Sequence, residues 1–261
     1  MNGFFDCHVH TCHSYDCETP PEALCEAALA AGLAGIAVTD HVETQGISAP
    51  GMEQSAADSF AAAKKLRAAY AGRLTVLCGI ELGDPLSDLP RAERVLAARP
   101  YDMVLASVHS TPEGLDYYYF DFSNADIGAE ISRYFDTVLR TAEWGRFHAL
   151  AHLTYPFRYL PADKYPANYD PWQSQIDAVL LALAGRGLAL EINTAGLRGP
   201  CGSNDPRKLT SPDFPIIKRF RELGGRRVTL GSDAHCAGDV GLGLAEAAVL
   251  AWEAGLVVIS D

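Results

Sequence analysis

Short apolar runs alternate along the chain with longer segments in which apolar residues recur every three or four positions. The first pattern predicts buried strands, and the second predicts helices that pack on one face. Seven strands are predicted, at residues 3–8, 35–39, 74–80, 103–108, 147–151, 188–193 and 227–231. Residues 256–259 are a candidate for a short eighth strand.

A helix is predicted after each of the seven strands, at residues 19–32, 56–71, 89–98, 125–144, 172–184, 214–223 and 242–254. A loop rich in Gly, Pro and Ser covers residues 194–212. Alternating strands and helices favour a parallel sheet covered by helices. Seven such units suit a closed or nearly closed barrel better than an open doubly wound sheet. The glycine-rich dinucleotide turn of such a sheet is missing after the first strand.

Composition narrows the classes of function. The chain has 261 residues, which α/β barrels reach as one domain, and no linker divides it, so we expect residues 1–261 to form a single domain. A net charge of −12 without a basic tract disfavours long nucleic acid as a partner. No apolar run is long enough to span a membrane, and the amino terminus lacks a signal-peptide pattern.

Seven cysteines are an odd count in a chain too large to need disulfides, which predicts reduced thiols and a cytoplasmic location. The even spacing of Cys7, Cys12 and Cys17 could suggest a thiolate site. The spacing matches no common zinc pattern, however, and we interpret these cysteines as structural or incidental.

The first strand ends in a group of possible metal ligands. Side chains alternate along a strand, so His8 and His10 should project from one face, with Asp16 close behind. Two imidazoles and a carboxylate are the beginning of a divalent-metal site. The alternative is a surface loop that happens to be rich in histidine.

Similar residues follow nearly every other predicted strand. They are Asp40, His41, Glu81, His109, His152, Glu191, Asp233 and His235. In a parallel barrel these strand ends open on one face, where barrel enzymes keep their active sites. Among the eight histidines only His148 lies inside a predicted strand. This distribution predicts a polynuclear metal site.

Histidine and carboxylate ligands without thiolates suit Zn, Mn or Fe rather than Mg alone. The ligands are more than one ion needs, so we expect two or three ions bridged by a carboxylate such as Glu81. Clusters of this kind stabilise charge on the attacking and leaving oxygens of a phosphoryl group, which implies phosphoester hydrolysis.

Seven motifs in order resemble those of the PHP (polymerase and histidinol phosphatase) superfamily, and the later ones are most like its monofunctional histidinol-phosphatase branch. They are His8-Val9-His10 with Ser14 and Asp16, Thr39-Asp40-His41, Gly79-Ile80-Glu81, Ser107-Val108-His109-Ser110, Ala151-His152, Glu191-Ile192-Asn193-Thr194-Ala195-Gly196-Leu197-Arg198 and Gly231-Ser232-Asp233-Ala234-His235. The resemblance covers essentially the whole chain. It implies an α/β fold, a distorted TIM-like (β/α)7 barrel with a trinuclear metal centre at the carboxyl ends of its strands.

Carried over by position, the resemblance implies three ligand sets. They are His8, His10, Glu81 and Asp233; then Glu81, His109 and His152; then Asp16, His41 and His235. We further predict catalytic roles for Asp40, His41, Asp233 and His235. Asp40 would orient His41 or its ion, or help to protonate the leaving alkoxide.

Arg158 and Arg198 resemble the phosphate-binding arginines of the same branch, and arginine matches a phosphate group with two parallel hydrogen bonds. The alternative for each is a solvated loop arginine. The branch often has an acidic residue where this chain has Thr154, which bears on substrate orientation or on a contact to His152.

Several residues keep two interpretations. Tyr117–Tyr119 form either a lid over the substrate or the anchor of their loop. His13 either supports a metal ligand through a hydrogen bond or is an ordinary loop residue. We interpret His148 as a packed, hydrogen-bonded histidine. We interpret Glu191 as a carboxylate that lies near the metals.

The hypothesis that follows is a metal-dependent phosphomonoesterase that converts L-histidinol phosphate to L-histidinol and phosphate in histidine biosynthesis. Its partner would be a small phosphorylated substrate, and the oligomeric state stays open. One alternative is a PHP phosphoesterase for a sugar phosphate, a nucleotide or a short nucleic acid. The other is a barrel that only stores metal or stabilises a partner.

Overall fold

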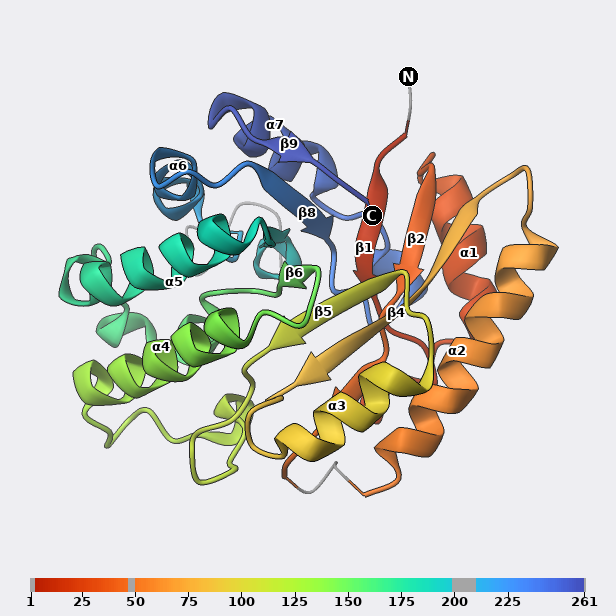
Figure 1. Cartoon of the computed structure of the whole chain (residues 1–261). Helices are drawn as coiled ribbons and strands as arrows, with labels where there is room; N and C mark the ends of the chain where they lie inside the picture. The colour runs from red at the N-terminus through yellow and green to blue at the C-terminus, as the bar shows by residue number, and fades with distance from the viewer. Residues whose placement is uncertain (1–2, 47–49, 199–209, 261) are drawn as a thin grey trace.

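The chain forms a sheet of parallel strands curved into a distorted barrel, with helices around its outside (Figure 1). This computed structural model describes residues 3–46, 50–198 and 210–260. Residues 199–209, within the predicted loop 194–212, lie outside the described part. The predicted fold class is confirmed.

The sheet runs in the order β1-β2-β4-β5-β6-β7-β8-β9, and β3 pairs with β4. Its strands are β1 (Phe5–Val9), β2 (Gly35–Val38), β3 (His41–Glu43), β4 (Thr75–Gly83), β5 (Met103–Ser107), β6 (Ala149–Leu150), β7 (Ala189–Asn193), β8 (Arg227–Gly231) and β9 (Val257–Val258). All seven predicted strands are present, and β9 is the candidate eighth strand. Every pairing is parallel, so all carboxyl ends point the same way.

Strand β3 was not predicted. The second predicted strand ends before His41, but the chain resumes pairing there, with His41 opposite Glu81 in the longer strand β4. The prediction missed β3 because its three residues include only one apolar side chain, Val42, so they carry no strand pattern of their own.

Seven helices lie in the described part of the chain. They are α1 (Pro21–Ala30), α2 (Met52–Ala69), α3 (Leu89–Ala98), α4 (Ile127–Trp144), α5 (Gln173–Arg186), α6 (Phe214–Glu222) and α7 (Leu244–Glu253). All seven predicted helices are present, although α2 begins four residues before its predicted start. None of the described helices is long and apolar enough to cross a membrane.

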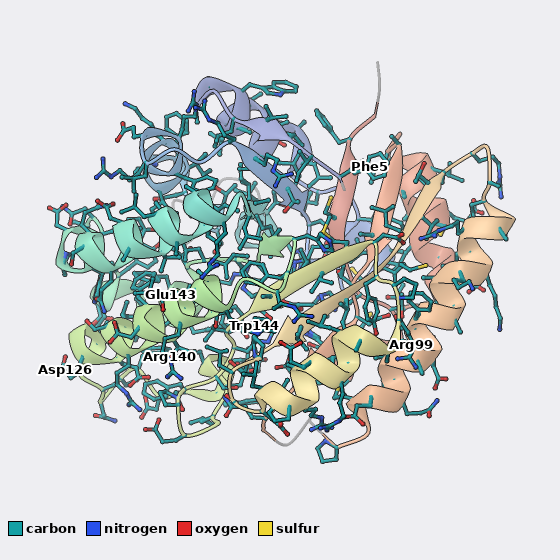
Figure 2. The ribbon with its side chains drawn as sticks, viewed as in Figure 1. Phe5, Arg99, Asp126, Arg140, Glu143 and Trp144 are labelled. Atoms are coloured by element: carbon teal, nitrogen blue, oxygen red, sulfur yellow. The ribbon has the colours of Figure 1, made fainter. Side chains whose placement is uncertain are left out.

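The residues at the two ends of helix α4 determine where the helix begins and ends, and one of them contacts α3. Its amino end is capped by Asp126, whose carboxylate accepts a hydrogen bond from the Ala129 amide at 3.1 Å. It ends at Gly145, which has φ +68°. Trp144, at the other end of the helix from Asp126, donates a hydrogen bond to Glu93 of α3 at 3.0 Å (Figure 2).

Small and medium apolar side chains from five strands fill the barrel interior. This cluster consists of Cys7, Ala37, Met103, Leu105, Ala149, Ala151 and Ala189. Larger side chains pack between the sheet and the helices. The apolar interior therefore stops near the carboxyl ends of the strands, where buried polar residues take over.

The barrel closes beside those polar residues. The amide of Asp233 donates to the carbonyl of His8 at 2.8 Å, and the amide of His10 donates to the carbonyl of Ala234 at 2.9 Å. These bonds tie the end of β1 to the segment after β8. Closure therefore fixes the first and last predicted ligand motifs against one another.

Gly231 is required for close packing at this closure. A Cβ atom there would overlap the carboxylate of Glu191 and lie 2.6 Å from the Cβ of His8. We expect Gly231→Ala to lower the free energy of unfolding by about 1–3 kcal/mol, because buried neighbours cannot move aside without strain. Urea denaturation measures the change.

The matched control is Gly185→Ala in α5, where a Cβ atom meets nothing within 4 Å. There, alanine should raise the free energy of unfolding by up to about 1 kcal/mol, since it favours helix. Equal stabilities for the two variants would contradict this account of Gly231.

Candidate metal centre

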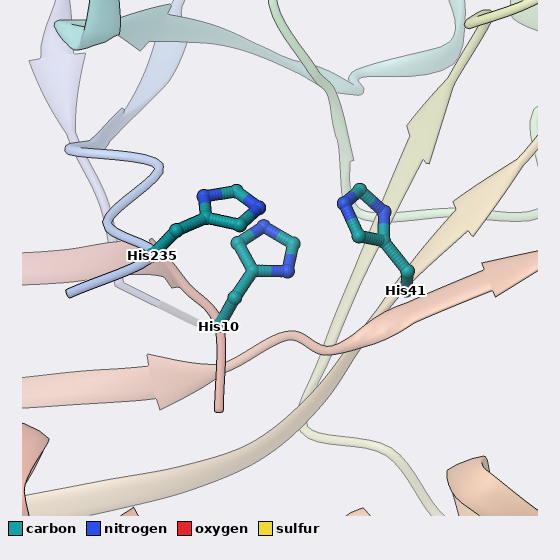
Figure 3. A group of neighbouring side chains, drawn as sticks. All are labelled: His10, His41 and His235. Atoms are coloured by element: carbon teal, nitrogen blue, oxygen red, sulfur yellow. The ribbon is translucent and has the colours of Figure 1, made fainter. Parts of the chain in front are cut away.

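Six histidines from five strand ends gather at the carboxyl end of the barrel. They are His8, His10, His41, His109, His152 and His235. The rings of His8 and His10 lie 5.0 Å apart, as expected for alternate residues that share a face. Figure 3 shows how His10, His41 and His235, from distant parts of the chain, face one another. The His10 ring is 4.1 Å from that of His235 and 4.3 Å from that of His41.

Glu81, which is fully buried, lies at the centre of this group. One carboxylate oxygen, Oε2, is 3.3 Å from Nε2 of His8 and 2.9 Å from Nδ1 of His41. The other, Oε1, is 3.2 Å from Nε2 of His109 and 2.8 Å from Nε2 of His152. A carboxylate between imidazoles on both sides has the geometry of a bridging ligand.

Two further carboxylates complete the group. Oδ1 of Asp233 lies 3.4 Å from Nε2 of His10 and 3.7 Å from Nε2 of His8. Oδ2 of Asp16 lies 3.5 Å from Nε2 of His41 and 3.3 Å from Nε2 of His235. The structure thus brings together all nine side chains predicted as metal ligands.

Several of these atoms are buried without a hydrogen-bond partner among the described residues. They are Nε2 of His8, Nε2 of His10, Nδ1 of His41 and Oε2 of Glu81. Buried polar atoms in proteins are normally satisfied, so such a group points to a cation as the shared partner. In the described part, four sets of three side chains could each hold a metal ion, and none contains a cysteine.

The electrostatics of the centre favour positive charge. Burial disfavours the charged form of Glu81, but the neighbouring imidazoles, His8 first, hold its pKa well below the usual value. Burial likewise opposes protonation of His41, yet Glu81 and Asp16 raise its pKa well above the usual value. The pKa of Asp233 is lowered well below its usual value despite burial, chiefly by His8.

Polar groups behind the histidines fix the orientation of three rings. Nδ1 of His8 lies 2.7 Å from Glu191, Nδ1 of His10 lies 3.0 Å from Ser14, and Nδ1 of His109 lies 2.9 Å from Glu43. In each case the second ring nitrogen, Nε2, then faces the centre. Glu191 also accepts a hydrogen bond from the His152 amide at 2.8 Å, so it supports two of the histidines from behind.

Asp40 lies behind the histidines rather than at the cavity. Its carboxylate accepts hydrogen bonds from the Thr11 amide at 2.6 Å, the Thr11 hydroxyl at 2.7 Å, Ser14 at 2.8 Å and Ser59 at 2.6 Å. It is buried and does not line the cavity above the centre. Asp40 thus supports the loop that carries Ser14 and His10, and Ser14 in turn accepts a hydrogen bond from the His41 amide at 3.1 Å. This position favours the predicted orienting role over protonation of the leaving group.

Sequence reasoning missed two supporting carboxylates. Glu43 lies 3.3 Å from Nδ1 of His41 as well as next to His109, and burial opposes its ionisation while these imidazoles lower its pKa to about 2. Asp84 accepts hydrogen bonds from the amides of His109 and Ser110, and burial raises its pKa to about 7. The available signal was alternation, because Glu43 is two residues after His41.

The backbone at the site is conformationally unusual. Asp84, His152 and Asp233 have φ values of +50°, +21° and +56°, and they are the only described non-glycine residues with positive φ. Such strain is held in place by surrounding contacts and clusters at functional sites. Gly83 adds a steric requirement, because a Cβ atom there would overlap the carboxylate of Glu43.

A cavity of about 560 Å³ opens above the centre and is lined by Asp16, His41, His109, His152, Asp233 and His235, among others. Arg158 and Arg198 line it as well, and neither is a freely solvated side chain. Arg158 contacts Asp233 at 3.1 Å and Asn193 at 2.7 Å. Arg198 donates to the carbonyls of Ser232 and Asp233.

The remaining candidates divide between the cavity and the scaffold. Tyr117 is buried and donates a hydrogen bond to Glu130 at 2.8 Å, so it anchors its loop. Tyr118 and Tyr119 are 62% and 66% exposed and line the cavity. The tyrosine run therefore combines the anchor of the loop with two side chains at the cavity mouth.

Three other positions lie away from the substrate space. Thr154 hydrogen-bonds Ser211 at 2.7 Å, and no described contact joins its side chain to His152. His13 does not line the cavity, and its amide donates to Thr11 at 3.2 Å. His148 accepts a hydrogen bond from the Val104 amide at 2.8 Å, as predicted, but it is exposed rather than packed inside the barrel.

Comparison with known proteins identifies a family and several relatives. A family model described as PHP domain matches residues 6–195. A probable histidinol-phosphatase of Deinococcus radiodurans is 33% identical over 95% of this chain and 92% of its own length. A probable histidinol-phosphatase of Thermotoga maritima is 30% identical over 92% of this chain and 88% of its own.

A solved structure has the same fold over nearly the whole chain. It is a histidinol phosphate phosphatase of Lactococcus lactis complexed with zinc, L-histidinol and phosphate. The TM-score is 0.86 at 26% identity, over 98% of this chain and 95% of that one.

The position of Glu43 leads to a measurable expectation. We expect Glu43→Ala to lower the affinity for Zn²⁺ by about 10- to 100-fold, because the rings of His41 and His109 lose the carboxylate that orients them. Competition with a chromophoric chelator measures the affinity without any turnover. The control is Glu53→Ala, which removes an exposed carboxylate near Arg91 and Arg94 of α3. Equal zinc affinities for the two variants would rule out this role.

Proposed function

The chain belongs to the PHP domain family, and on this basis we propose that it is a metal-dependent phosphomonoesterase that converts L-histidinol phosphate and water to L-histidinol and phosphate. The observation that carries the proposal is the buried Glu81 between imidazoles on both sides, next to a cavity with two arginines. The proposal includes a role in histidine biosynthesis, a cytoplasmic location and a single domain over residues 1–261.

We assign two or three divalent ions, Zn, Mn or Fe, to the centre. The proposed ligand sets are His8, His10, Glu81 and Asp233; Glu81, His109 and His152; and Asp16, His41 and His235. Neutral imidazoles and carboxylates are the donors that these metals share. When bound, such ions act as Lewis acids towards phosphoryl oxygens and make water acidic enough to serve as a nucleophile at neutral pH.

The protein's own side chains would orient the phosphate. Arg158 is already held by Asp233 and Asn193, while its Nε–H group is buried without a hydrogen-bond partner among the described residues. Arg158 also lines the cavity, so its guanidinium group is held in place beside the space that a phosphate would occupy. Arg198, fixed by two backbone carbonyls, adds a second positive charge at the same side of the cavity.

Three predicted catalytic residues keep that assignment in the proposal. His41, Asp233 and His235 line the cavity, so they can touch the phosphate or the groups that react with it. Asp40 is assigned instead as a positioning residue behind His10. Burial of Glu81 and His8 keeps bulk water away from the base of the site, which strengthens electrostatic contacts to the developing charge.

The cavity also bears on the alternative substrates. Among its described lining residues, Arg158 and Arg198 are the only arginines, and lysine is absent. Two arginines match one phosphate group, whereas a polynucleotide requires a longer basic track. We therefore favour a small phosphomonoester over nucleic acid.

The decisive experiment is phosphate release by the metal-reconstituted protein. The panel contains L-histidinol phosphate, sugar phosphates, nucleotides and short oligonucleotides. We expect kcat/KM for histidinol phosphate to exceed the others by orders of magnitude, with activity lost on chelation and restored by metal. Comparable rates on another ester would overturn the substrate, and no release by metal-loaded protein would overturn the enzymatic proposal.

We expect Arg158→Ala to lower kcat/KM by about 100- to 1,000-fold, as losing one preorganised donor to the transition state does in other enzymes. Steady-state kinetics with histidinol phosphate measures the effect. The control is Arg146→Ala, since Arg146 is exposed, pairs with Glu93 and does not line the cavity. A loss of less than threefold in Arg158→Ala would remove this arginine from the phosphate site.

A further inference from the structure

Charge is distributed unevenly around the cavity. Arg158 and Arg198 lie beside Asp233, after strands β6 and β7. The segment after β5 lines the cavity too, and it carries an acidic residue, Asp116, next to the exposed rings of Tyr118 and Tyr119. A substrate in this cavity therefore meets positive charge in one place and negative charge in another.

Asp116 is held in place by its own backbone and side chain. It pairs with Ser110 in an antiparallel bridge, and the amide of the next residue, Tyr117, donates to the carbonyl of His109 at 2.9 Å. Its Oδ1 accepts hydrogen bonds from the Tyr118 amide at 2.7 Å and from the Tyr155 hydroxyl at 3.2 Å. The carboxylate is thus fixed relative to the metal centre.

The second oxygen of this carboxylate, Oδ2, makes no hydrogen bond or ion pair with any described residue. The other acidic residues of the cavity lining are already engaged. Asp16 and Glu43 contact the histidines, and Asp233 contacts Arg158. Asp116 is therefore the described carboxylate of the lining that is free to bind a ligand.

Tyr155 spans the distance between the two charged regions. Its ring centroid is 5.0 Å from those of His109 and His152, and the guanidinium carbon of Arg158 lies 5.5 Å from the same centroid. Its hydroxyl reaches Asp116 at the far end of the ring. One rigid side chain thus sets the separation between the arginine and the carboxylate.

We propose that Asp116 determines substrate specificity by binding a positively charged nitrogen of the organic half of the phosphomonoester. The inference rests on the proposed function, since the phosphate must occupy the side of Arg158. L-Histidinol carries an ammonium group and an imidazole, either of which supplies a cationic nitrogen. The exposed rings of Tyr118 and Tyr119 favour the same charge through their faces.

The test variant is Asp116→Asn. The amide oxygen of asparagine can still accept the hydrogen bonds from Tyr118 and Tyr155, so the turn is retained while the charge is removed. We expect kcat/KM for L-histidinol phosphate to fall about 10- to 100-fold, mainly through KM, because a hydrogen bond to a charged group is lost. Hydrolysis of p-nitrophenyl phosphate, which has no cationic nitrogen, should change less than twofold.

Two analogues identify the nitrogen. One lacks the amino group of histidinol phosphate, and the other replaces its imidazole by hydrogen. The fall in kcat/KM caused by Asp116→Asn should persist with the analogue that retains the nitrogen bound by Asp116. Persistence with one analogue and not the other, whichever it is, supports the inference. An equal loss on all substrates, p-nitrophenyl phosphate included, would reduce Asp116 to a structural role and overturn it, as would no loss on any.

The control variant is Asp121→Asn, an exposed carboxylate of the same loop that caps Ser123 and does not line the cavity. It should leave both kinetic constants unchanged. Asp116→Ser, which can also cap the turn, replaces Asp116→Asn if that variant fails to fold.

A binding measurement separates this inference from the proposed function. Calorimetry of the metal-loaded protein should show weaker binding of L-histidinol to Asp116→Asn and unchanged binding of inorganic phosphate. If the wild type does not hydrolyse histidinol phosphate, the proposed function fails, and O-phosphoethanolamine then tests Asp116 alone. A selective loss on that substrate would sustain the inference, and an unselective one would overturn it.

Discussion

The buried carboxylate of Glu81 is the constraint on which the rest of the site depends. A fully buried carboxylate is costly unless positive charge lies close to it. Four imidazole nitrogens lie within 3.3 Å of its two oxygens, and they come from strands β1 and β3 and from the segments after β5 and β6. The carboxyl end of the barrel is therefore organised around one negative charge that favours cations.

A metal centre of this kind requires that its imidazole rings keep fixed orientations. Glu191 and Glu43 contact ring nitrogens that face away from the centre, and Asp40 reaches His10 through Ser14. These buried carboxylates carry their own desolvation cost, and hydrogen bonds with His8, His109 and backbone amides offset it. The polar end of the barrel thus resembles a core in which hydrogen bonds replace apolar packing.

In the proposed enzyme, chemistry and selectivity come from different parts of the fold. The strand ends carry the histidines and carboxylates, whose positions follow from the pairing of the sheet. The loops after β5 and β6 carry Asp116, Tyr155 and Arg158, which surround the space above. This arrangement is common in barrel enzymes, in which a rigid sheet fixes the reactive groups and differences among the loops change which substrate is bound.

The sequence alone predicted the parallel strands and the barrel from local periodicity, and it predicted the nine clustered side chains from their places near strand ends together with the resemblance to the PHP superfamily. Alternation places His8 and His10 on one face whatever the distant contacts are, and parallel strands bring their carboxyl ends together. The same local reasoning assigned a catalytic role to Asp40 only because Asp40 directly precedes His41 in the sequence. In the structure Asp40 points towards Thr11 and Ser59, whereas His41 points towards Glu81.

Only the tertiary structure shows where Glu43, Asp84 and Asp116 lie at the site. Strand β3 exists because its residues pair with the extension of β4, and that register places Glu43 against His109, 66 positions away in the sequence. Asp116 faces the cavity because Tyr155, from the next loop, holds it there. Contacts between distant segments depend on how strands and loops pack, so alternation could place Glu43 on the same face as His41 but could not identify His109 as its partner.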